Sequence, residues 1–276
     1  MNKLTKTILI SFSFLLSLGI FTSCEDFFNP DQDVTIVEED LYTDWYEYRA
    51  VSMGLYSLQK DLVEQLVVLG ELRGDLLTVT SNADEDLMEI YNFNINKNNK
   101  YAEPDKFFEL IAACNRFIST LETKKSDVLD HTKPVNNYDR LYGEALTMRA
   151  WAYFNAVRIY GNVPLIDEKL RTVEEINEFI NSPMYVDSVY IDYGVNGYDN
   201  DTIKQEPVQL EIKYLNTKQV IRHFAHELET KVKVVKNVPV VGVNHYIDND
   251  DTSWEVTIWS QWSYHTLLGH MYLTLG

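Results

Sequence analysis

Cysteine is scarce in this sequence, which has only Cys24 and Cys114 among its 276 residues. If Cys24 is covalently modified, Cys114 is the one thiol left, and no disulfide can form within the chain. Cys114 ends an apolar stretch, residues 107–114, whose composition favours a helix. We therefore expect a buried, inert thiol at Cys114 and not a nucleophile.

Basic side chains are also few. The chain has 24 Lys and Arg against 42 Asp and Glu, a net charge of −18 at pH 7. So acidic a chain repels nucleic acid and anionic lipid head groups, and no nucleic-acid partner is expected. Hydrophobic residues make up 45% of the chain and aromatic residues 13%, which is enough for a core and excludes disorder. The length allows one large domain or two small ones.

The motifs of common catalytic sites are missing. The sequence has no Gly-rich phosphate-binding loop, no G-x-S-x-G and no convincing Cys-His pair. Carboxylates such as Asp84 and Asp86 lie close together, but nothing around them indicates a raised pKa, so a surface glycan hydrolase is the least supported alternative. The sequence predicts a protein that is not an enzyme and has no cofactor.

Metal-ligand patterns are incomplete. Residues 226–230 resemble the start of a zinc-protease motif, but Thr230 stands where the second histidine is needed. His223 and His226 can share a helix face, yet two histidines do not complete a tetrahedral zinc site. Residues 248–251 are all Asp or Asn but lack the glycine and the distal glutamate of a calcium loop. We expect solvated histidines, a solvated acidic turn and no metal.

The apolar run near the N-terminus, Ile8 to Phe21, is too short and too rich in serine for a comfortable membrane span. Lys3 and Lys6 precede it, and small residues separate it from Cys24. This order is typical of a secretory signal peptide, cut either near Ser23 or just before the cysteine.

Cys24 resembles the cysteine of a bacterial lipobox, although Phe21 stands where most lipoboxes have leucine. The resemblance implies a signal peptide over residues 1–23 and acyl chains on Cys24. Each buried methylene adds about 0.8 kcal/mol, so several acyl chains hold a protein firmly on a membrane. Without residues 1–23 the chain has 22 basic and 42 acidic side chains, a net charge of −20, so lipid and not a basic patch should make the membrane contact.

Residues 24–40 are expected to form an acidic tether. Glu25 and Asp26 directly follow the cysteine and resemble the surface-export signal of Bacteroidetes lipoproteins. An ordinary acidic tether explains them equally well. The remaining residues, 41–276, are expected to form the folded domain.

Apolar residues recur at helical spacing along much of this domain. They predict helices at 41–69, 104–122, 138–160, 172–181, 217–233 and 253–275. Asn and Asp dominate residues 78–100, which favours loops. Five tyrosines among polar residues in 183–214 predict an irregular excursion with a strand or two, and the β-branched residues 232–243 favour extended chain. The expected fold is mostly α, with paired antiparallel helices stacked as in tetratricopeptide repeats and short strand insertions.

Arg149 lies inside the predicted helix 138–160, in an apolar setting. A buried charge without a partner is costly, so the guanidinium needs a carboxylate or carbonyl groups. Glu144 lies five residues earlier, a poor spacing for a pair within one helix. We therefore expect the partner of Arg149 on another helix.

Residues 141–165 resemble the signature of the SusD/RagB family. They contain a Gly-Glu-Ala run, then Arg-Ala, an aromatic cluster and Tyr-Gly-x-Val-Pro-Leu, in the family's spacing. Further pieces follow the family's order: the lipobox, residues 107–116, residues 227–229 and, more loosely, residues 267–273. The patterned small and apolar residues of 141–165 indicate packing, so we expect the signature itself to be structural.

The resemblance implies an outer-membrane lipoprotein that captures oligosaccharides, or sometimes peptides, outside the cell. Such a protein acts as a lid on a TonB-dependent, SusC-like barrel transporter and catalyses no reaction. Family members are about twice as long, so residues 41–276 would be the N-terminal half of a domain truncated at its C-terminus. The apolar last helix favours truncation, because such a face needs a partner. The alternative is a non-binding remnant or a structural or assembly lipoprotein.

Sugar binding needs flat apolar faces beside polar groups that bond hydroxyls. Two stretches offer this mixture, residues 73–93 and residues 185–198. In SusD-like relatives the ligand residues often come from loops after the first helix, which favours the first stretch. The residues expected to bind ligand are Arg73, Asp75, Asn82, Tyr91 and Phe93.

Overall fold

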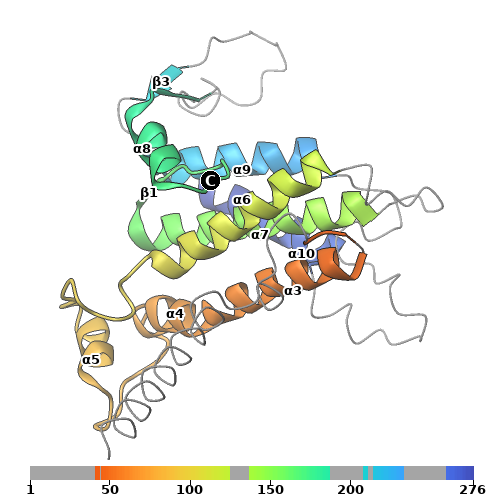
Figure 1. Ribbon diagram of the computed structural model, residues 1–276. Coiled ribbons are helices and arrows are strands. Elements are labelled where there is room, and N and C mark those ends of the chain that lie inside the picture. Colours follow the sequence, from red (N-terminus) through yellow and green to blue (C-terminus); the bar gives the residue numbers. More distant parts are fainter. Residues whose placement is uncertain (1–40, 44, 125–136, 187–207, 211–213, 233–258) are drawn as a thin grey trace, which may run out of the picture. The chain divides into compact units, whose positions relative to one another are not determined.

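The computed structural model of the chain describes residues 41–43, 45–124, 137–186, 208–210, 214–232 and 259–276 (Figure 1). The chain divides into two compact units, residues 1–48 and 49–276. In the first unit, Tyr42 packs on Tyr48 with ring centroids 4.9 Å apart. The expected signal peptide, Cys24, the tether and residues 248–251 lie outside the described residues.

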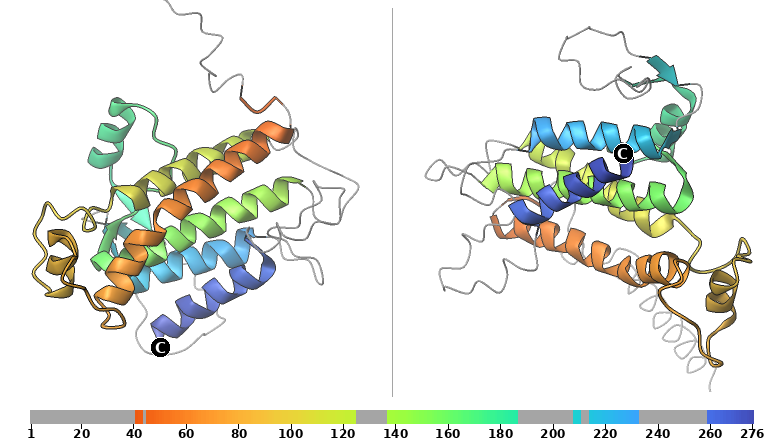
Figure 2. Two further views of the ribbon diagram at one scale, coloured as in Figure 1. Left: turned by 90° about the horizontal axis from the view of Figure 1, so that it is seen from below. Right: turned by 180° about the vertical axis from the view of Figure 1, so that it is seen from behind.

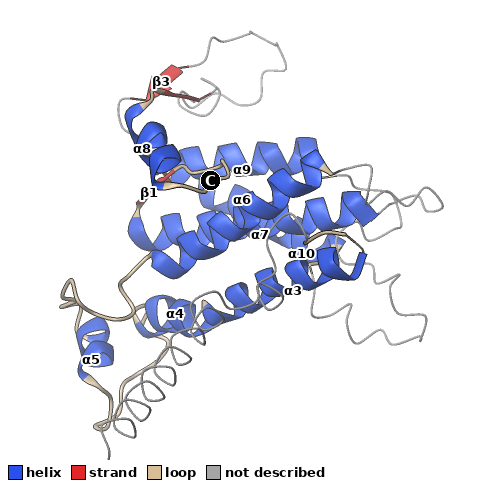
Figure 3. Ribbon diagram, in the orientation of Figure 1, coloured by secondary structure: helices blue, strands red, loops and turns tan. Residues whose placement is uncertain are grey.

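Helices dominate the described residues, which confirms the mostly-α prediction (Figure 3). The helices are α3 (Trp45–Asp61), α4 (Val63–Val67), η2 (Val68–Leu72), α5 (Glu85–Tyr91), α6 (Asp105–Thr123), α7 (Asn137–Tyr160), α8 (Val173–Asn181), α9 (Thr217–Lys231) and α10 (Gln261–Leu275). The bounds of α6, α7, α8 and α9 agree closely with the predicted helices at 104–122, 138–160, 172–181 and 217–233.

The single helix expected over 41–69 is wrong in detail. α3 ends at Asp61, where the Leu62 N–H donates to Gln59 O at 3.2 Å, and α4 and η2 follow. η2 is a π-helix, and the Arg73 N–H donates to Val68 O, five residues back, at 3.2 Å. A π-turn adds one residue to a single helical turn and is rare, so the predicted helix did not include it.

A helix also lies inside the segment expected to be loop, residues 78–100. The Asp84 carboxylate accepts a hydrogen bond from the Leu87 N–H at 2.9 Å and caps α5. Glu85 and Asp86 stand in the first turn, where the helix dipole favours negative charge. The sequence signal for this helix was the capping residue Asp84 followed by two acidic residues. The prediction missed the helix because it rested on the high Asn and Asp content of the whole segment.

α6, α7 and α9 form the core of the second unit. Tyr142 near the start of α7 donates to Glu122 at the end of α6 at 2.7 Å, and Tyr160 at the end of α7 donates to Glu103 O, just before α6, at 3.2 Å, so the two helices are antiparallel. α9 packs on α7 in the same manner, with the rings of Tyr153 and Phe224 stacked at 4.4 Å. Figure 2 (left) shows these helices side by side, with α10 next to α9 at the edge.

Small residues in α7 permit this close packing. Ala145, Ala150, Ala152 and Ala156 are fully buried there, as predicted for the signature segment. Cys114 of α6 is also fully buried, which confirms the predicted burial, and burial raises the pKa of its thiol to about 12, which disfavours the reactive thiolate.

Two short antiparallel strand pairs attach to the helices. β1 (Asn162–Pro164) pairs with β4 (Tyr214–Asn216), with Val163 opposite Leu215, and β2 (Met184–Val186) pairs with β3 (Val208–Leu210). Gly161, at φ +80°, turns the chain out of α7 into β1. Asn216 ends β4 and also caps α9 by accepting from the Gln219 N–H at 3.1 Å, so the β1–β4 pair fixes where α9 begins.

α10 begins at Gln261 and not at residue 253, because Ser260 caps it and accepts from the Ser263 N–H at 3.3 Å. Residues 253–258 lie outside the described residues. In the part of the chain that the structure describes, no helix combines the length and the apolar character that a bilayer span requires.

Candidate functional site

The expected ligand residues all lie in one segment, residues 68–101, here called the α5 lobe. Its core consists of Val68, Leu69, Leu72, Ile90 and Tyr101, with Val79, Leu87, Tyr91 and Ile159 packed against it. Ile159 belongs to α7 and so ties the lobe to the helical core. Gln65 of α4 donates to Tyr101 O and Glu103 O, both at 2.7 Å, and fixes the return of the chain toward α6.

Four of the five expected ligand residues are exposed: Arg73, Asp75, Asn82 and Phe93. Among the described residues, the Arg73 and Asp75 side chains form no hydrogen bond or ion pair, so both remain available to a ligand. Tyr91 differs from the others, because it is half-buried against the lobe core and its hydroxyl accepts from Thr78 Oγ1 at 3.4 Å. Its ring therefore stabilises the lobe whether or not a ligand contacts it.

The backbone of the lobe is strained at two of these positions. Asp75 has φ +67° and Phe93 has φ +55°, the left-handed region that L-residues rarely adopt. Strain of this kind persists where the surroundings enforce it, and it often marks a functional site. At Phe93 the result is an aromatic ring held 70% exposed to solvent directly after α5.

Gly74 makes the turn between the two exposed charges. Its N–H donates to Gly70 O at 2.8 Å, and a Cβ built on Gly74 would lie 2.5 Å from that same oxygen. Only glycine, which has no Cβ, allows the backbone to come this close. Gly74 therefore fixes the turn that positions Arg73 and Asp75.

The lobe also exposes apolar side chains that sequence reasoning missed. Leu76 is 75% exposed, and Leu77, Met88 and Ile95 are exposed as well. These residues sit in stretches whose composition indicates loops, and periodicity does not show which apolar loop residues face solvent. Together with Phe93 they give the lobe a concentration of exposed apolar side chains.

The acidic and amide side chains of the lobe mostly bond one another. Lys100 pairs with Asp84 at 2.6 Å, and this hydrogen bond is the main reason why the pKa of Asp84 is lowered. Asn99, fully buried, donates to Asp86 O and to Glu89 Oε2, both at 2.9 Å, and the bond to Glu89 lowers the pKa of that carboxyl. These groups hold the 92–101 loop on α5 and are not free for a ligand.

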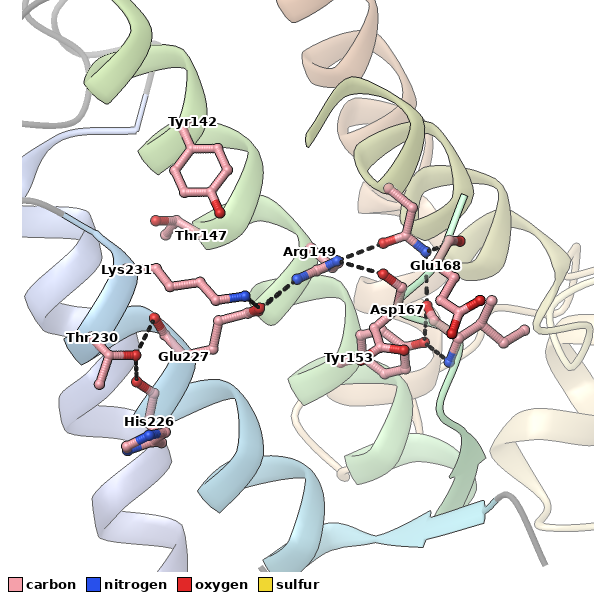
Figure 4. A network of polar contacts seen from close by, with 12 residues as sticks. Tyr142, Thr147, Arg149, Tyr153, Asp167, Glu168, His226, Glu227, Thr230 and Lys231 are labelled. Atoms are coloured by element: carbon pink, nitrogen blue, oxygen red, sulfur yellow. Dashed lines mark hydrogen bonds and ion pairs between the residues drawn. The ribbon is translucent and has the colours of Figure 1, made fainter. Parts of the chain in front are cut away.

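A second group of polar residues lies buried between α6, α7 and α9 (Figure 4). Arg149 Nη2 donates to both oxygens of Glu227 at 2.7 Å, and its Nη1 donates to Asn115 Oδ1 at 2.7 Å and to Asp167 O at 3.3 Å. Lys231 adds a contact of 2.9 Å to Glu227. The expected partner of Arg149 on another helix is therefore confirmed, and Glu144 is not that partner.

Electrostatics keep this pair ionised. Burial by itself would raise the pKa of Glu227, but the charges of Arg149 and then Lys231 outweigh it, and the pKa is lowered. Burial likewise opposes the charge on Arg149, yet Glu227 raises the pKa of the guanidinium. Asn115 extends the network by donating to Ile166 O at 2.8 Å, so one cluster joins three helices to the chain after β1.

Glu144 forms a separate buried cluster with α3. Ser52 and Tyr56 donate to its carboxylate at 3.1 and 3.2 Å, and the Tyr56 hydroxyl accepts from the Trp259 N–H at 2.8 Å. Burial raises the pKa of Glu144, despite the nearby charges of Arg49 and Arg140. Both clusters hold helices together inside the protein, in agreement with a structural interpretation of the signature.

Metal-ligating side chains do not gather in the described residues, where no group of three or more His, Cys, Asp and Glu could hold an ion. His226 is exposed, as expected for a solvated helix-face histidine. His223 is half-buried instead, with its ring edge-on to Phe224 at 4.8 Å, and burial lowers its pKa.

Residues 51–182 match a protein family described as SusD-like, "Starch-binding associating with outer membrane". Over 170 residues the chain is 30% identical to SusD-like protein P38 of Formosa agariphila. This segment is therefore similar to the SusD/RagB family, in agreement with the resemblance of residues 141–165. The similarity covers 59% of this chain and 31% of the relative, so the chain spans about a third of the relative's length in the match. No solved structure matches the chain.

The SusD-like segment contains the whole α5 lobe, Arg149 and α8. Glu227, which pairs with Arg149, lies outside it, so the ion pair joins the SusD-like segment to the chain that follows. Within the segment, the α5 lobe exposes the expected ligand residues, whereas the signature of residues 141–165 contributes mainly buried side chains to the helical core.

Proposed function

We propose that this SusD-like chain is a cell-surface lipoprotein that binds nutrient glycans, or peptides, and delivers them to a TonB-dependent, SusC-like transporter in the outer membrane. The match to a family described as starch-binding and associated with the outer membrane carries the proposal. Binding without catalysis is proposed with it, because the exposed groups of the lobe can hold a ligand but offer no positioned acid–base pair.

The α5 lobe is the proposed ligand surface. The exposed ring of Phe93 can take the C–H face of a pyranose, and the uncommitted side chains of Arg73, Asp75 and Asn82 can bond its hydroxyl groups. Since these groups sit on a lobe with its own core, their positions are set before ligand arrives, which reduces the entropic cost of binding.

Phe93→Ala should weaken glycan binding about tenfold or more, because an exposed aromatic anchor contributes a large share of the contact area. Isothermal titration against a panel that begins with starch oligosaccharides and continues to other glycans and peptides measures the effect. Ile180→Ala is the matched control, because Ile180 is an exposed apolar residue on α8, outside the lobe. Equal affinity of both variants would show that the ligand does not bind at the lobe. Absence of measurable binding by the folded parent chain across the panel would overturn the proposal that this chain binds a ligand.

Anchoring through acylated Cys24 is the second part of the proposal, supported by the order of charged, apolar and small residues before it. Cells given a radiolabelled fatty acid should label the parent chain and Cys114→Ser but not Cys24→Ser. Cys114 is the matched control, since it is the other cysteine and is fully buried. Label on Cys24→Ser, or none on the parent chain, would contradict the anchor.

A further inference from the structure

The two ends of the α5 lobe meet at one buried side chain, that of Gln65. The lobe begins with η2, three residues after Gln65, and it ends at Tyr101, from which the chain leads into α6. Gln65 is only 4% exposed, and its side chain bonds the returning chain at residues 101 and 103. A residue at the beginning of the lobe therefore also holds its end.

The bonds of Gln65 require an amide in one orientation. Tyr101 O and Glu103 O are carbonyl oxygens, which only accept, and the two N–H groups of Gln65 Nε2 supply both donors. Tyr160, the last residue of α7, accepts from the same Nε2 at 3.3 Å and donates to Glu103 O at 3.2 Å. These four residues, here called the Gln65 network, join α4, the end of α7 and the chain before α6.

Other contacts between the lobe and the helical core leave more freedom. Ile159 packs on the lobe core, but apolar packing has no preferred direction. Glu64 accepts from the Tyr101 hydroxyl at 2.9 Å, yet Glu64 is exposed, so water competes for this bond. The bond from Gln65 to Tyr101 O is buried and directional. The Gln65 network is therefore the contact best suited to fix the ends of the lobe.

The expected ligand residues lie on both arms of the lobe. Arg73 and Asp75 follow directly after η2, on the arm that begins near Gln65. Phe93 follows α5, at the start of the 92–101 loop that returns to the Gln65 network. Closing a loop at its base restricts the independent motion of its two arms. The spacing between the charged pair and the aromatic ring thus depends on the Gln65 network.

We propose that Gln65 is a positioning residue for the ligand surface, which holds Arg73 and Asp75 in place relative to Phe93 by joining the two ends of the α5 lobe. This inference rests on the proposed function, since it concerns the affinity of the same surface. Gln65 is buried and acts through the backbone of the lobe. Loss of its amide lowers the fraction of chains whose lobe is ready to bind, and the apparent affinity falls with that fraction.

Gln65→Met tests the network, because methionine has a similar volume and no N–H donor. Hydrogen exchange of the full chain should become about tenfold faster across residues 68–101 and stay unchanged in α9. The dissociation constant for the starch oligosaccharide maltoheptaose, measured by titration calorimetry, should rise about tenfold. Gln59→Met is the matched control, since Gln59 is a half-buried glutamine of α3 whose side chain forms no hydrogen bond or ion pair with the described residues. It should behave like the parent.

Gln65→Glu gives a response to pH that a change of packing alone does not give. An ionised carboxyl group would face two carbonyl oxygens with no proton to donate, and burial raises its pKa. The nearby acidic groups of Glu103 and Asp105, which also raise the pKa of Tyr160, act in the same direction. Protonation restores one donor, so slow exchange and affinity should partly recover, relative to the parent, as pH falls toward about 4.3. Gln65→Met should show no such recovery.

The outcomes separate this inference from the proposed function, because hydrogen exchange needs no ligand. Equal exchange in Gln65→Met and Gln59→Met, or no recovery of Gln65→Glu in acid, overturns the role of the network. Faster exchange with unchanged affinity for maltoheptaose overturns the positioning role. A parent chain that binds no member of the ligand panel, while Gln65→Met still loosens the lobe, supports the network and counts against the proposed function.

Discussion

Arg149→Met should destabilise the protein by about 3 kcal/mol or more, because it leaves Glu227 buried without its main partner. For a domain of this size such a loss lowers the melting temperature by roughly 6–12 °C. Lys231 does not replace the guanidinium, since its ammonium group is half exposed and makes one contact where Arg149 makes two. Differential scanning calorimetry of the parent and the variant measures the loss.

Two further variants show whether the loss comes from the unpaired charge. Arg149→Met combined with Glu227→Leu should recover much of the stability, because removing both charges leaves no buried ion uncompensated. Lys100→Met breaks an exposed pair with Asp84 and should leave the melting temperature unchanged. If the double variant is no more stable than Arg149→Met, the two residues do not act as a pair.

The pH dependence of stability gives the same pair a second signature. The folded pKa of Glu227 is lowered, so its contribution is fully present above the unfolded value of about 4.3 and is lost as pH falls through the folded value. In Arg149→Met, burial dominates and raises the pKa of Glu227. Acid then protonates Glu227 and removes the uncompensated buried charge that destabilises the variant. The difference in unfolding free energy between parent and variant should therefore be largest near neutral pH and shrink below about pH 4. A difference that does not change with pH would contradict the ionised pair.

The helical core could be predicted from the sequence because its signals are local and repeated. Apolar spacing and the small residues of α7 define the buried faces, and the cost of burying Arg149 alone requires a partner. This energetic argument does not identify which residue is the partner of Arg149. Glu227 lies 78 residues away along the chain, and only the antiparallel packing of α7 and α9 brings the two together.

The α5 lobe shows where such reasoning stops. Asn and Asp favour loops in isolation, but Asp84 uses the same chemistry to cap a helix whose Ile90 is buried in the lobe core. The expected ligand residues do lie in this one lobe, yet Tyr91 is partly occupied in packing. Left-handed backbone at Asp75 and Phe93 depends on contacts made after folding; aspartate is enriched in this region but phenylalanine is not, so the residue types do not predict the pair.

Gly74→Ala should destabilise the α5 lobe by about 2 kcal/mol, because the added methyl group would lie 2.5 Å from the backbone oxygen of Gly70. Backbone on both sides must shift, and the shift reaches Arg73 and Asp75 directly. The expected result is faster hydrogen exchange across residues 68–101 with little change in α6, α7 and α9, and weaker glycan binding wherever the parent binds.

Gly70→Ala provides the matched control within the same turn. A Cβ at Gly70 meets nothing within 4 Å, and alanine is a better helix former than glycine by roughly 0.5–1 kcal/mol, so this variant should be as stable as the parent or slightly more stable. If Gly74→Ala destabilises the lobe and Gly70→Ala does not, the steric fit at Gly74, and not general backbone flexibility, stabilises the lobe. If Gly74→Ala leaves hydrogen exchange in the lobe unchanged while it weakens glycan binding, the effect lies in contact with the ligand and the strained turn is not its cause.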